Sequence, residues 1–343
     1  MTSLPDIPDI TDIALAERLQ RSLDNKTKPV GALGRIEALA MRIGCILGRE
    51  APALDAPQML VCAADHGLAA KGVSAYPSDV TWQMVQNFLA GGAAVSVLAR
   101  QHGLALTVVD CGVRHDFAPQ PGLLIRKIGP GTADASIGPA MTADQCTQAI
   151  ANGREVVRAM PGNALLLGEM GIGNTSAASM LLSRLAGLDL AGCVGAGTGL
   201  DAAGLARKRN VLAGVMDLHR DAASPLDALA AFGGFEIATL VGAVLEAAQA
   251  RRVIVVDGFI TGAAVLVAQA LRPNVVQRCV ASHESAEPGH ALLLACLGLQ
   301  PLLRLDLRLG EGSGAALAWP LLESACRILR EMASFEAAGV SRA

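Results

Sequence analysis

The sequence predicts an α/β protein: a doubly wound parallel sheet flanked by helices, with a small helical subdomain formed by both chain ends. Short apolar runs alternate along the chain with segments of helical spacing, and this alternation is typical of a parallel sheet covered by helices. Most of the apolar runs end on glycine beside a polar residue, as expected where the carboxyl ends of parallel strands bind a ligand. Of the 343 residues, 52% are hydrophobic and 17% are charged, so the chain can bury a large core.

The first half of the chain begins with two helices and continues with strands and helices in alternation. Apolar residues recur every three or four positions in residues 12–24 and 32–49, which is the spacing of one helix face. We expect strands at 59–64 and 106–110, and helices at 80–98 and 142–160, the last with Thr142 as its N-cap. A loop rich in Gly and Pro is expected between the second strand and the last helix.

The second half of the chain repeats this pattern. We expect strands at 164–167, 192–194, 253–256, 277–281 and 302–307, and a helix at 177–185. The apolar stretch 253–271 contains Asp257 and two glycines, so a strand, a turn and a helix explain it better than a membrane span does. Both chain ends are helical and lack strand patterns. We therefore expect residues 1–50 and 315–343 to form the helical subdomain, and residues 51–314 to form a Rossmann-like catalytic domain.

Charge and cysteine content exclude several classes of function. The net charge is −3 and no run of Lys or Arg is longer than three residues, so nucleic acid is not expected as a partner. The eight cysteines include no C-x-x-C pair, which is typical of reduced thiols in a cytoplasmic protein. The first residues include the acids Asp6, Asp9 and Asp12, so no export signal is expected.

Motif spacing excludes other kinds of site. No Walker-type phosphate loop occurs, and the glycines at 195, 197 and 199 do not form the G-x-G-x-x-G motif of dinucleotide-binding proteins. His283 and Glu284 begin like a zinc-protease motif, but position 287 is a glutamate where that motif needs histidine. We therefore expect no metal site and no bound cofactor.

Two glycine-rich loops carry acidic residues that could do chemistry. Residues 168–176 follow an expected strand and lead into a helix, and backbone N–H groups at such a helix start can bind a phosphate. The same glycines could also serve only a tightly packed turn. Glu311 lies between Gly310 and Gly312 just before another helix, where it could be no more than a capping acid. From these loops alone, both alternatives stay open.

An ordered set of segments resembles the nicotinate-nucleotide:dimethylbenzimidazole phosphoribosyltransferase family. The segments are KPVGALGRIEAL (28–39), the long block 64–100, VVDCGV (108–113), GPAMT (138–142), GEMGIGNTS (168–176), GAGTGLD (195–201), SHESAEPGH (282–290) and RLGEGSGAALAWPL (308–321). The resemblance runs from about residue 20 to residue 340. Ser176 and Ser313 stand where the family often has threonine, and both keep a hydroxyl group.

The resemblance implies a homodimer that transfers the 5-phosphoribosyl group from nicotinate mononucleotide to 5,6-dimethylbenzimidazole, a step of cobalamin biosynthesis. It also implies that Glu311 is the catalytic glutamate. When one benzimidazole nitrogen attacks C1′ of the ribose, the N–H of the other nitrogen becomes acidic, and a carboxylate can accept its proton. Because the pyridinium ring of the donor leaves as a neutral ring, we expect direct displacement with inversion and without a metal.

The remaining candidate residues are assigned to parts of the two substrates by the same resemblance. Phosphate contacts are expected from Gly171, Ile172, Gly173, Asn174, Gly197, Thr198, Gly199 and Lys208. The aromatic base is expected to contact Ser74, Gln83, Met84, Leu309 and Gly310. Glu169 is expected near the ribose or as a support of the loop. Lys208 could instead belong to a solvated helix face, and Met84 to ordinary helix packing. Asp65, His66, Asp257 and His283 end expected strands and could line the cleft, but they receive no defined role.

Two other classes of function remain as alternatives. A nucleotide-binding oxidoreductase could use the same sheet, but it would need a true G-x-G-x-x-G motif followed by an acid that reads the ribose. A binding module without catalysis would keep the pocket and would have no need of Glu311. The sequence does not decide how strictly the acceptor must be 5,6-dimethylbenzimidazole.

Overall fold

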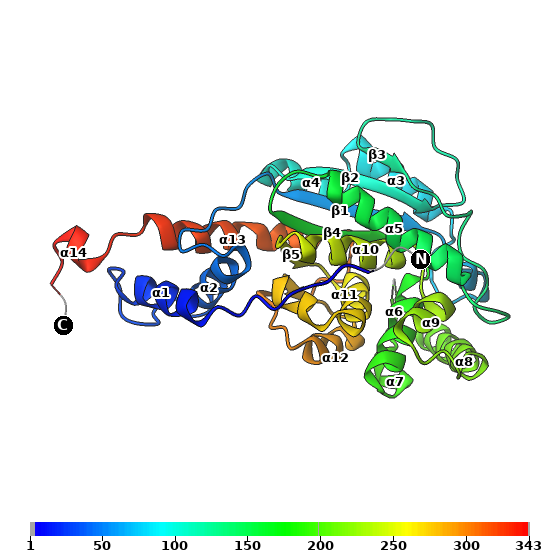
Figure 1. The fold of residues 1–343 in the computed structure, drawn as a ribbon. Helices are drawn as coiled ribbons and strands as arrows, with labels where there is room; N and C mark the ends of the chain where they lie inside the picture. Colours follow the sequence, from blue (N-terminus) through cyan, green and yellow to red (C-terminus); the bar gives the residue numbers. More distant parts are fainter. Residues whose placement is uncertain (1–3, 198, 342–343) are drawn as a thin grey trace.

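The computed structural model describes residues 4–197 and 199–341. A six-stranded, wholly parallel sheet lies at its centre, in the order β3-β2-β1-β4-β5-β6 (Figure 1). The strands are β1 Gln58–Ala64, β2 Ala105–Gly112, β3 Leu123–Ile125, β4 Ala164–Met170, β5 Val253–Val256 and β6 Cys279–Ala281. The order reverses between β1 and β4, which is where doubly wound sheets open a crevice at the strand ends. The predicted fold class is confirmed.

The strands are buried on both faces because their side chains are apolar on both. In β1, Leu60 and Cys62 belong to the core on one side of the sheet, and Met59 and Val61 belong to the core on the other. All four side chains are fully buried. This alternation follows from the two-residue period of a strand, and burial on both faces is typical of parallel sheets.

Helices cover each face of the sheet (Figure 1). One face is covered by α5 Ala143–Ala159, α6 Asn174–Ala186, α9 Pro225–Phe232, α10 Phe235–Gln249, α11 Phe259–Leu271 and α12 Pro288–Leu297, with α8 Ala202–Leu218 at its edge. The other is covered by α1 Ile13–Asp24, α2 Arg35–Leu47, α3 Val80–Ala90, α4 Ala94–His102 and α13 Ser313–Glu331. Thr142 caps α5, as predicted, and forms a capping box with Gln145. No helix within the described ranges is long and apolar enough to cross a membrane.

The first helices, α1 and α2, lie beside α13 at one end of the molecule, whereas the N-terminus lies far from the C-terminus (Figure 1). Lys26, just after α1, forms an antiparallel bridge with Ser334, which precedes the short helix α14 Phe335–Ala338. The long helix α13 packs on α2, but its Trp319 also belongs to the core that covers the sheet. The division into a subdomain of 1–50 with 315–343 and a domain of 51–314 therefore stays a prediction.

The segment before α1 is bound by two arginines that follow α11. The Arg272 guanidinium donates to the carbonyl oxygens of Leu4 and Pro5, at 3.2 and 2.8 Å. The Arg278 guanidinium donates to the carbonyl oxygen of Pro8 at 2.6 Å. Arg272 precedes the 3₁₀-helix η2, Pro273–Arg278, and Arg278 is its last residue, so the two arginines fasten the start of the chain to the segment that follows α11.

Two expected elements differ in the structure. The helix expected at 80–98 is two helices, α3 and α4. Gly91 has a φ of 81° and ends α3, as a left-handed glycine commonly ends a helix. The strand expected at 192–194 was wrong, because residues Leu190–Cys193 form one helical turn, α7.

Two further expected strands are shorter in the structure than the sequence predicted. Residues 302–307 were expected to form one strand, but only β8, Leu303–Arg304, is extended, and it pairs with β7, His283–Glu284, in a separate small sheet. The strand expected at 277–281 begins only at Cys279, after η2. The loop expected after β2 contains the edge strand β3, and a 3₁₀ turn, η1 Gly67–Lys71, follows β1.

Candidate active site

A cavity lies where β4 and β5 end and where α6 and α13 begin. It brings together eight of the predicted site residues: Glu169, Gly171, Ile172, Asn174, Gly197, Leu309, Gly310 and Glu311. Glu169 stands at the end of β4, the glycine loop joins β4 to α6, and Glu311 immediately precedes α13. The two loops that the sequence singled out are therefore neighbours in space, although about 140 residues separate them in the chain.

The turn that carries Glu311 has an unusual backbone. Gly310, Glu311 and Gly312 all have positive φ angles, of 81°, 66° and 90°. Glycine adopts this region easily, but a residue with a side chain pays about 1–2 kcal/mol there. A Cβ atom on Gly310 would lie 2.5 Å from Glu169 Oε1, and one on Gly312 would lie 2.8 Å from Met59 Sδ. Strain of this kind is typical of functional positions held by their surroundings.

The pKa values of Glu169 and Glu311, which line this cavity, are raised toward neutral pH. Glu311 is 5% exposed, and burial, with the nearby Asp257 carboxylate, raises its pKa to about 7. Burial likewise raises the pKa of Glu169 to about 8, against the lowering effect of the Asn174 amide that donates to it. A carboxylate whose pKa lies close to neutrality is suited to act as a general base.

The glycine loop after β4 is held by contacts inside the protein. Gly173, with a φ of 97°, is the N-cap of α6. The Ile172 N–H donates to Thr81 Oγ1 at 3.2 Å, and the Asn174 side chain donates to Glu169. The loop therefore offers only part of its backbone donors to a ligand, and its predicted contact with a phosphate stays a prediction.

Lys208 lies behind the second glycine loop. Its side chain is fully buried, so the alternative of a solvated helix face is wrong. The ammonium donates to Thr175 Oγ1 at 2.9 Å and to the Gly195 carbonyl oxygen at 3.2 Å, and burial lowers its pKa to about 8. Thr175 and Gly197 line the cavity, so the positive charge lies one layer behind its wall. The predicted contact from Thr198 falls outside the described residues, and Gly199 is not among those that line the cavity.

Three residues expected to bind the base do not line this cavity in the described part of the chain: Ser74, Gln83 and Met84. Met84 packs against the core on the sheet, as the packing alternative held, and Gln83 is exposed on α3. The same helix nevertheless borders the site, because Thr81 contacts the glycine loop. Their contact with the base stays a prediction.

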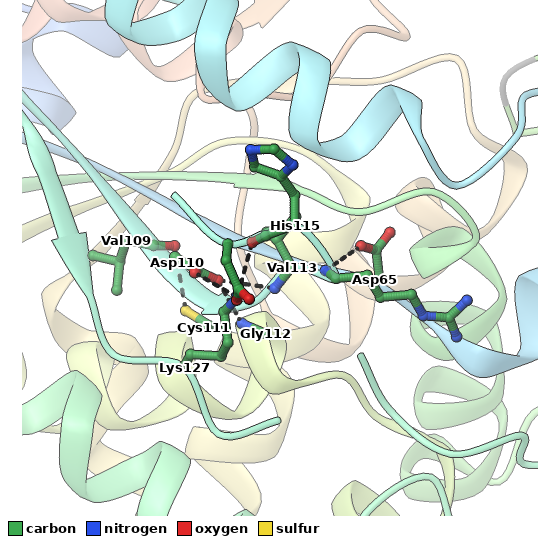
Figure 2. A network of polar contacts seen from close by, with 10 residues as sticks. Asp65, Val109, Asp110, Cys111, Gly112, Val113, His115 and Lys127 are labelled. Atoms are coloured by element: carbon green, nitrogen blue, oxygen red, sulfur yellow. Dashed lines mark hydrogen bonds and ion pairs between the residues drawn. The ribbon is translucent and has the colours of Figure 1, made fainter. Parts of the chain in front are cut away.

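The polar residues that end β1 and β2 serve the loops instead of the cavity (Figure 2). Asp110 accepts the N–H groups of Gly112 and Val113, at 3.0 and 2.8 Å, and its other oxygen lies 3.5 Å from Lys127 Nζ. Asp65 accepts the N–H of Arg114 at 2.9 Å. His66, also expected as a possible lining residue, pairs with buried Glu236 at 2.7 Å.

Several residues of the cavity were missed by the sequence analysis. They are Met170, Thr175, Gly258, Phe259, Ile260, Ser285, Glu287 and Arg308; His283, which had no assigned role, also lines the cavity. Phe259 and Ile260 begin α11 and give the cavity an apolar wall. Arg308 directly precedes Leu309 in the loop before Glu311. This proximity in the chain is the signal that could have identified Arg308 as a site residue.

Comparisons with known proteins find relatives that match nearly the whole chain. A family model described as phosphoribosyltransferase matches residues 9–340. A protein of Variovorax paradoxus (strain S110) named nicotinate-nucleotide–dimethylbenzimidazole phosphoribosyltransferase is 80% identical over 340 residues, which is 99% of this chain and 97% of that protein. One of the same name from Cupriavidus necator is 58% identical and covers 98% and 99% of the two chains. The crystal structure of CobT from Thermus thermophilus has a TM-score of 0.92 and 45% identity, covering 96% of this chain and 99% of that one.

Proposed function

This chain belongs to the nicotinate-nucleotide–dimethylbenzimidazole phosphoribosyltransferase family, and we propose that Glu311 is the base through which it carries out that family's transfer. The enzyme moves the 5-phosphoribosyl group of nicotinate mononucleotide to 5,6-dimethylbenzimidazole, and gives α-ribazole 5′-phosphate and nicotinate in cobalamin biosynthesis. The single observation that carries the role of Glu311 is its place: a buried carboxylate on a strained turn, with a pKa of about 7, that lines the cavity.

The reaction needs one proton acceptor. The lone pair of one benzimidazole nitrogen forms the new bond to C1′, while the bond from C1′ to the pyridinium nitrogen breaks and its electrons neutralise the leaving ring. The proton on the second benzimidazole nitrogen then passes to the Glu311 carboxylate. General-base catalysis of this kind contributes about 10²–10⁴-fold. No group has to protonate nicotinate, because its ring nitrogen leaves neutral.

The substrate contacts in this proposal use both loops and the apolar wall. Leu309, Phe259 and Ile260 supply apolar surface for the flat base, with Gln83 and Ser74 of the neighbouring segment as polar contacts. The loops at 171–174 and 197–199 hold the phosphate, and the buried ammonium of Lys208 supplies positive charge from behind them. Glu169 holds the loop through Asn174 and borders the ribose.

Direct displacement at C1′ inverts the configuration, so a β-linked donor yields an α-linked product. Glu311 is engaged with the proton of the base, and Glu169 is engaged with Asn174, so neither is assigned as a covalent nucleophile. We also propose that the reaction is independent of metal ions, because the donor is activated by its own ring charge. The enzyme works as a cytoplasmic homodimer in this proposal.

The test is turnover of the purified protein with nicotinate mononucleotide and 5,6-dimethylbenzimidazole in excess EDTA. We expect equimolar release of nicotinate and a product whose anomeric proton shows the α configuration by NMR. A β-linked product, or activity that is lost in EDTA and restored by Mg²⁺, contradicts the mechanism. A change in nicotinamide absorbance would support the oxidoreductase alternative, and binding without release of nicotinate would support the binding module. Light scattering of the same sample measures whether the protein is a dimer.

A further inference from the structure

Helix α13, which follows Glu311, begins without a cap of its own. Its N-cap residue is Gly312, which has no side chain to accept a hydrogen bond, although the first N–H groups of a helix need acceptors. Asp257, directly after β5, supplies them from 55 residues earlier in the chain. Its Oδ2 accepts the Gly312 N–H at 3.1 Å, and its Oδ1 accepts the Ala315 N–H at 2.9 Å.

The backbone on the other side of Glu311 is also held. The Glu311 N–H donates to the Glu169 carboxylate. The Glu311 carbonyl oxygen packs so closely on Gly168 that a Cβ atom there would lie 2.5 Å from it. Carboxylates at the ends of two neighbouring strands, β4 and β5, therefore hold the backbone before and after the left-handed residue.

Asp257 is not placed to contact the substrates itself. Its residue surface is 1% exposed, and it is not among the residues that line the cavity in the described chain. The His283 ring lies beside it, with Nδ1 at 3.9 Å from Oδ1 and at 3.0 Å from Ser282 Oγ. Burial lowers the pKa of His283 to about 4, so at neutral pH this ring brings no positive charge.

We propose that Asp257 is a positioning residue, which holds the turn so that the Glu311 carboxylate points at the base. The proposal rests on the role given to Glu311 in the proposed function. A carboxylate fits this position because it offers two acceptor oxygens to two N–H groups and interacts favourably with the start of a helix. If Asp257 served only to cap the helix, its loss would lower stability and leave the turnover of the folded enzyme unchanged.

A double-mutant cycle separates these two roles. We compare kcat for nicotinate release in the wild type, Asp257→Asn, Glu311→Gln and the double variant. Asparagine has the same size but keeps one acceptor oxygen for two donors. We expect kcat to fall about 10²-fold in Asp257→Asn, as for a catalytic group displaced by about 1 Å. In the Glu311→Gln background the same change should cost less than about threefold, because residues that act through one group are not additive.

Asp110→Asn is the matched control. Asp110 is also fully buried and also accepts two backbone N–H groups after a strand, but it lies at the β2 end of the sheet. We expect it to lower the melting temperature as Asp257→Asn does, with less than about a twofold change in kcat. If Asp257→Asn does not fold by circular dichroism, Asp257→Ser replaces it, since serine keeps one capping oxygen; about a tenfold loss of kcat is then expected.

Three results overturn the positioning role while the role of Glu311 stands. The first is wild-type kcat in the folded Asp257 variant, while Glu311→Gln is inactive; this leaves the proposed function intact. The second is an equal loss from Asp257→Asn with and without Glu311, which means that Asp257 acts by another route. The third is an equal loss of kcat in Asp110→Asn, which means that any buried cap is needed. Full activity of Glu311→Gln alone removes the proposed base and the positioning role together.

Discussion

Asp110 and Asp257 occupy equivalent places at two ends of one sheet, but their surroundings differ. Each lies at the carboxyl end of a parallel strand, is almost completely buried, and accepts two backbone N–H groups. Burial raises the pKa of both carboxyl groups. At Asp110 the ammonium of Lys127 lies 3.5 Å away and opposes that rise (Figure 2). At Asp257 the pKa reaches about 7, and its neighbours Glu169 and Glu311 are also acids with raised pKa values.

The difference teaches how the same residue at the same kind of strand end can serve structure or chemistry. At Asp110 the Lys127 ammonium favours the ionised carboxylate and opposes the effect of burial, and the carboxylate holds the loop through its two N–H partners. Glu169 and Glu311 in the cavity wall and Asp257 behind it are neighbouring acids that resist being ionised together, so protons are gained and lost near neutral pH. The β2 end of the sheet is therefore structural, and the end shared by β4 and β5 can transfer a proton.

The largest effect is expected from Glu311→Gln, which should break the chemistry of one region without weakening the fold. The amide cannot accept the benzimidazole proton, so kcat should fall by at least about 10². The raised pKa means that ionised Glu311 destabilises the folded state, so its removal should leave the free energy of unfolding unchanged or raise it by about 1–3 kcal/mol at pH 8. Rate assays and urea unfolding measure the two; more than about a tenth of wild-type kcat would reject Glu311 as the base.

Raising the pH should increase the activity and lower the stability contributed by the same carboxyl groups. Glu311 must be ionised to accept a proton, so kcat/KM should fall about tenfold per pH unit below an apparent pKa of about 7. Glu169, with a pKa of about 8, and Asp257, with about 7, titrate with it, so the observed value belongs to the group. In each, the pKa is raised in the folded state, so the contribution of these groups to stability is full below their ordinary pKa values of 3.8 and 4.5 and is lost as the pH rises to 7–8. An activity profile flat from pH 5.5 to 8.5 would contradict this assignment.

The smallest effect on catalysis is expected from Lys127→Met, which removes the positive charge beside Asp110. The Lys127 side chain is 20% exposed and also donates to the His115 carbonyl oxygen at 2.8 Å. Its loss should lower the free energy of unfolding by about 1–2 kcal/mol at pH 7, because a buried carboxylate loses its partner. kcat should change less than about twofold, since the site lies elsewhere. Urea unfolding and nicotinate release check both values, and a kcat loss like that of Glu311→Gln would erase the contrast between the two regions.

Much of the fold could be predicted from the sequence because the strands are apolar runs that are followed by glycine and polar residues. The run at 253–256 followed by Asp257 and Gly258 is an example, since β5 and α11 occur where the pattern placed them. The break at Gly91 was missed because apolar spacing continues through it from α3 into α4. The strand expected at 302–307 was too long, because only Leu303–Arg304 forms a strand, β8, and it pairs with β7 instead of joining the main sheet.

The candidate site was predictable only where one short loop contains the whole signal. Glu311 between two glycines, and Glu169 before the glycine loop, could be selected in that way, and the family resemblance then favoured a catalytic role for Glu311 over a capping role. Glu287, Phe259 and Arg308 come from three separate elements and share no local pattern. Lys208 lies between two arginines in the chain, and its burial depends on the packing of α8 on the loop at 195–197, which spacing alone does not show.

The segment before α1 has a practical consequence for handling the protein. Arg278 is fully buried, and the carbonyl oxygens of Leu4, Pro5 and Pro8 complete the bonding of the two arginines beside η2. Ile7, within this segment, is 3% exposed and joins the main core. A protease that trims these residues would uncover apolar surface and remove acceptors of guanidinium N–H groups of Arg272 and Arg278, conditions that favour aggregation. A purification tag is therefore better attached at the C-terminal side, since Val340 and Ser341 are exposed, than directly before the segment that contains Leu4, Pro5 and Pro8.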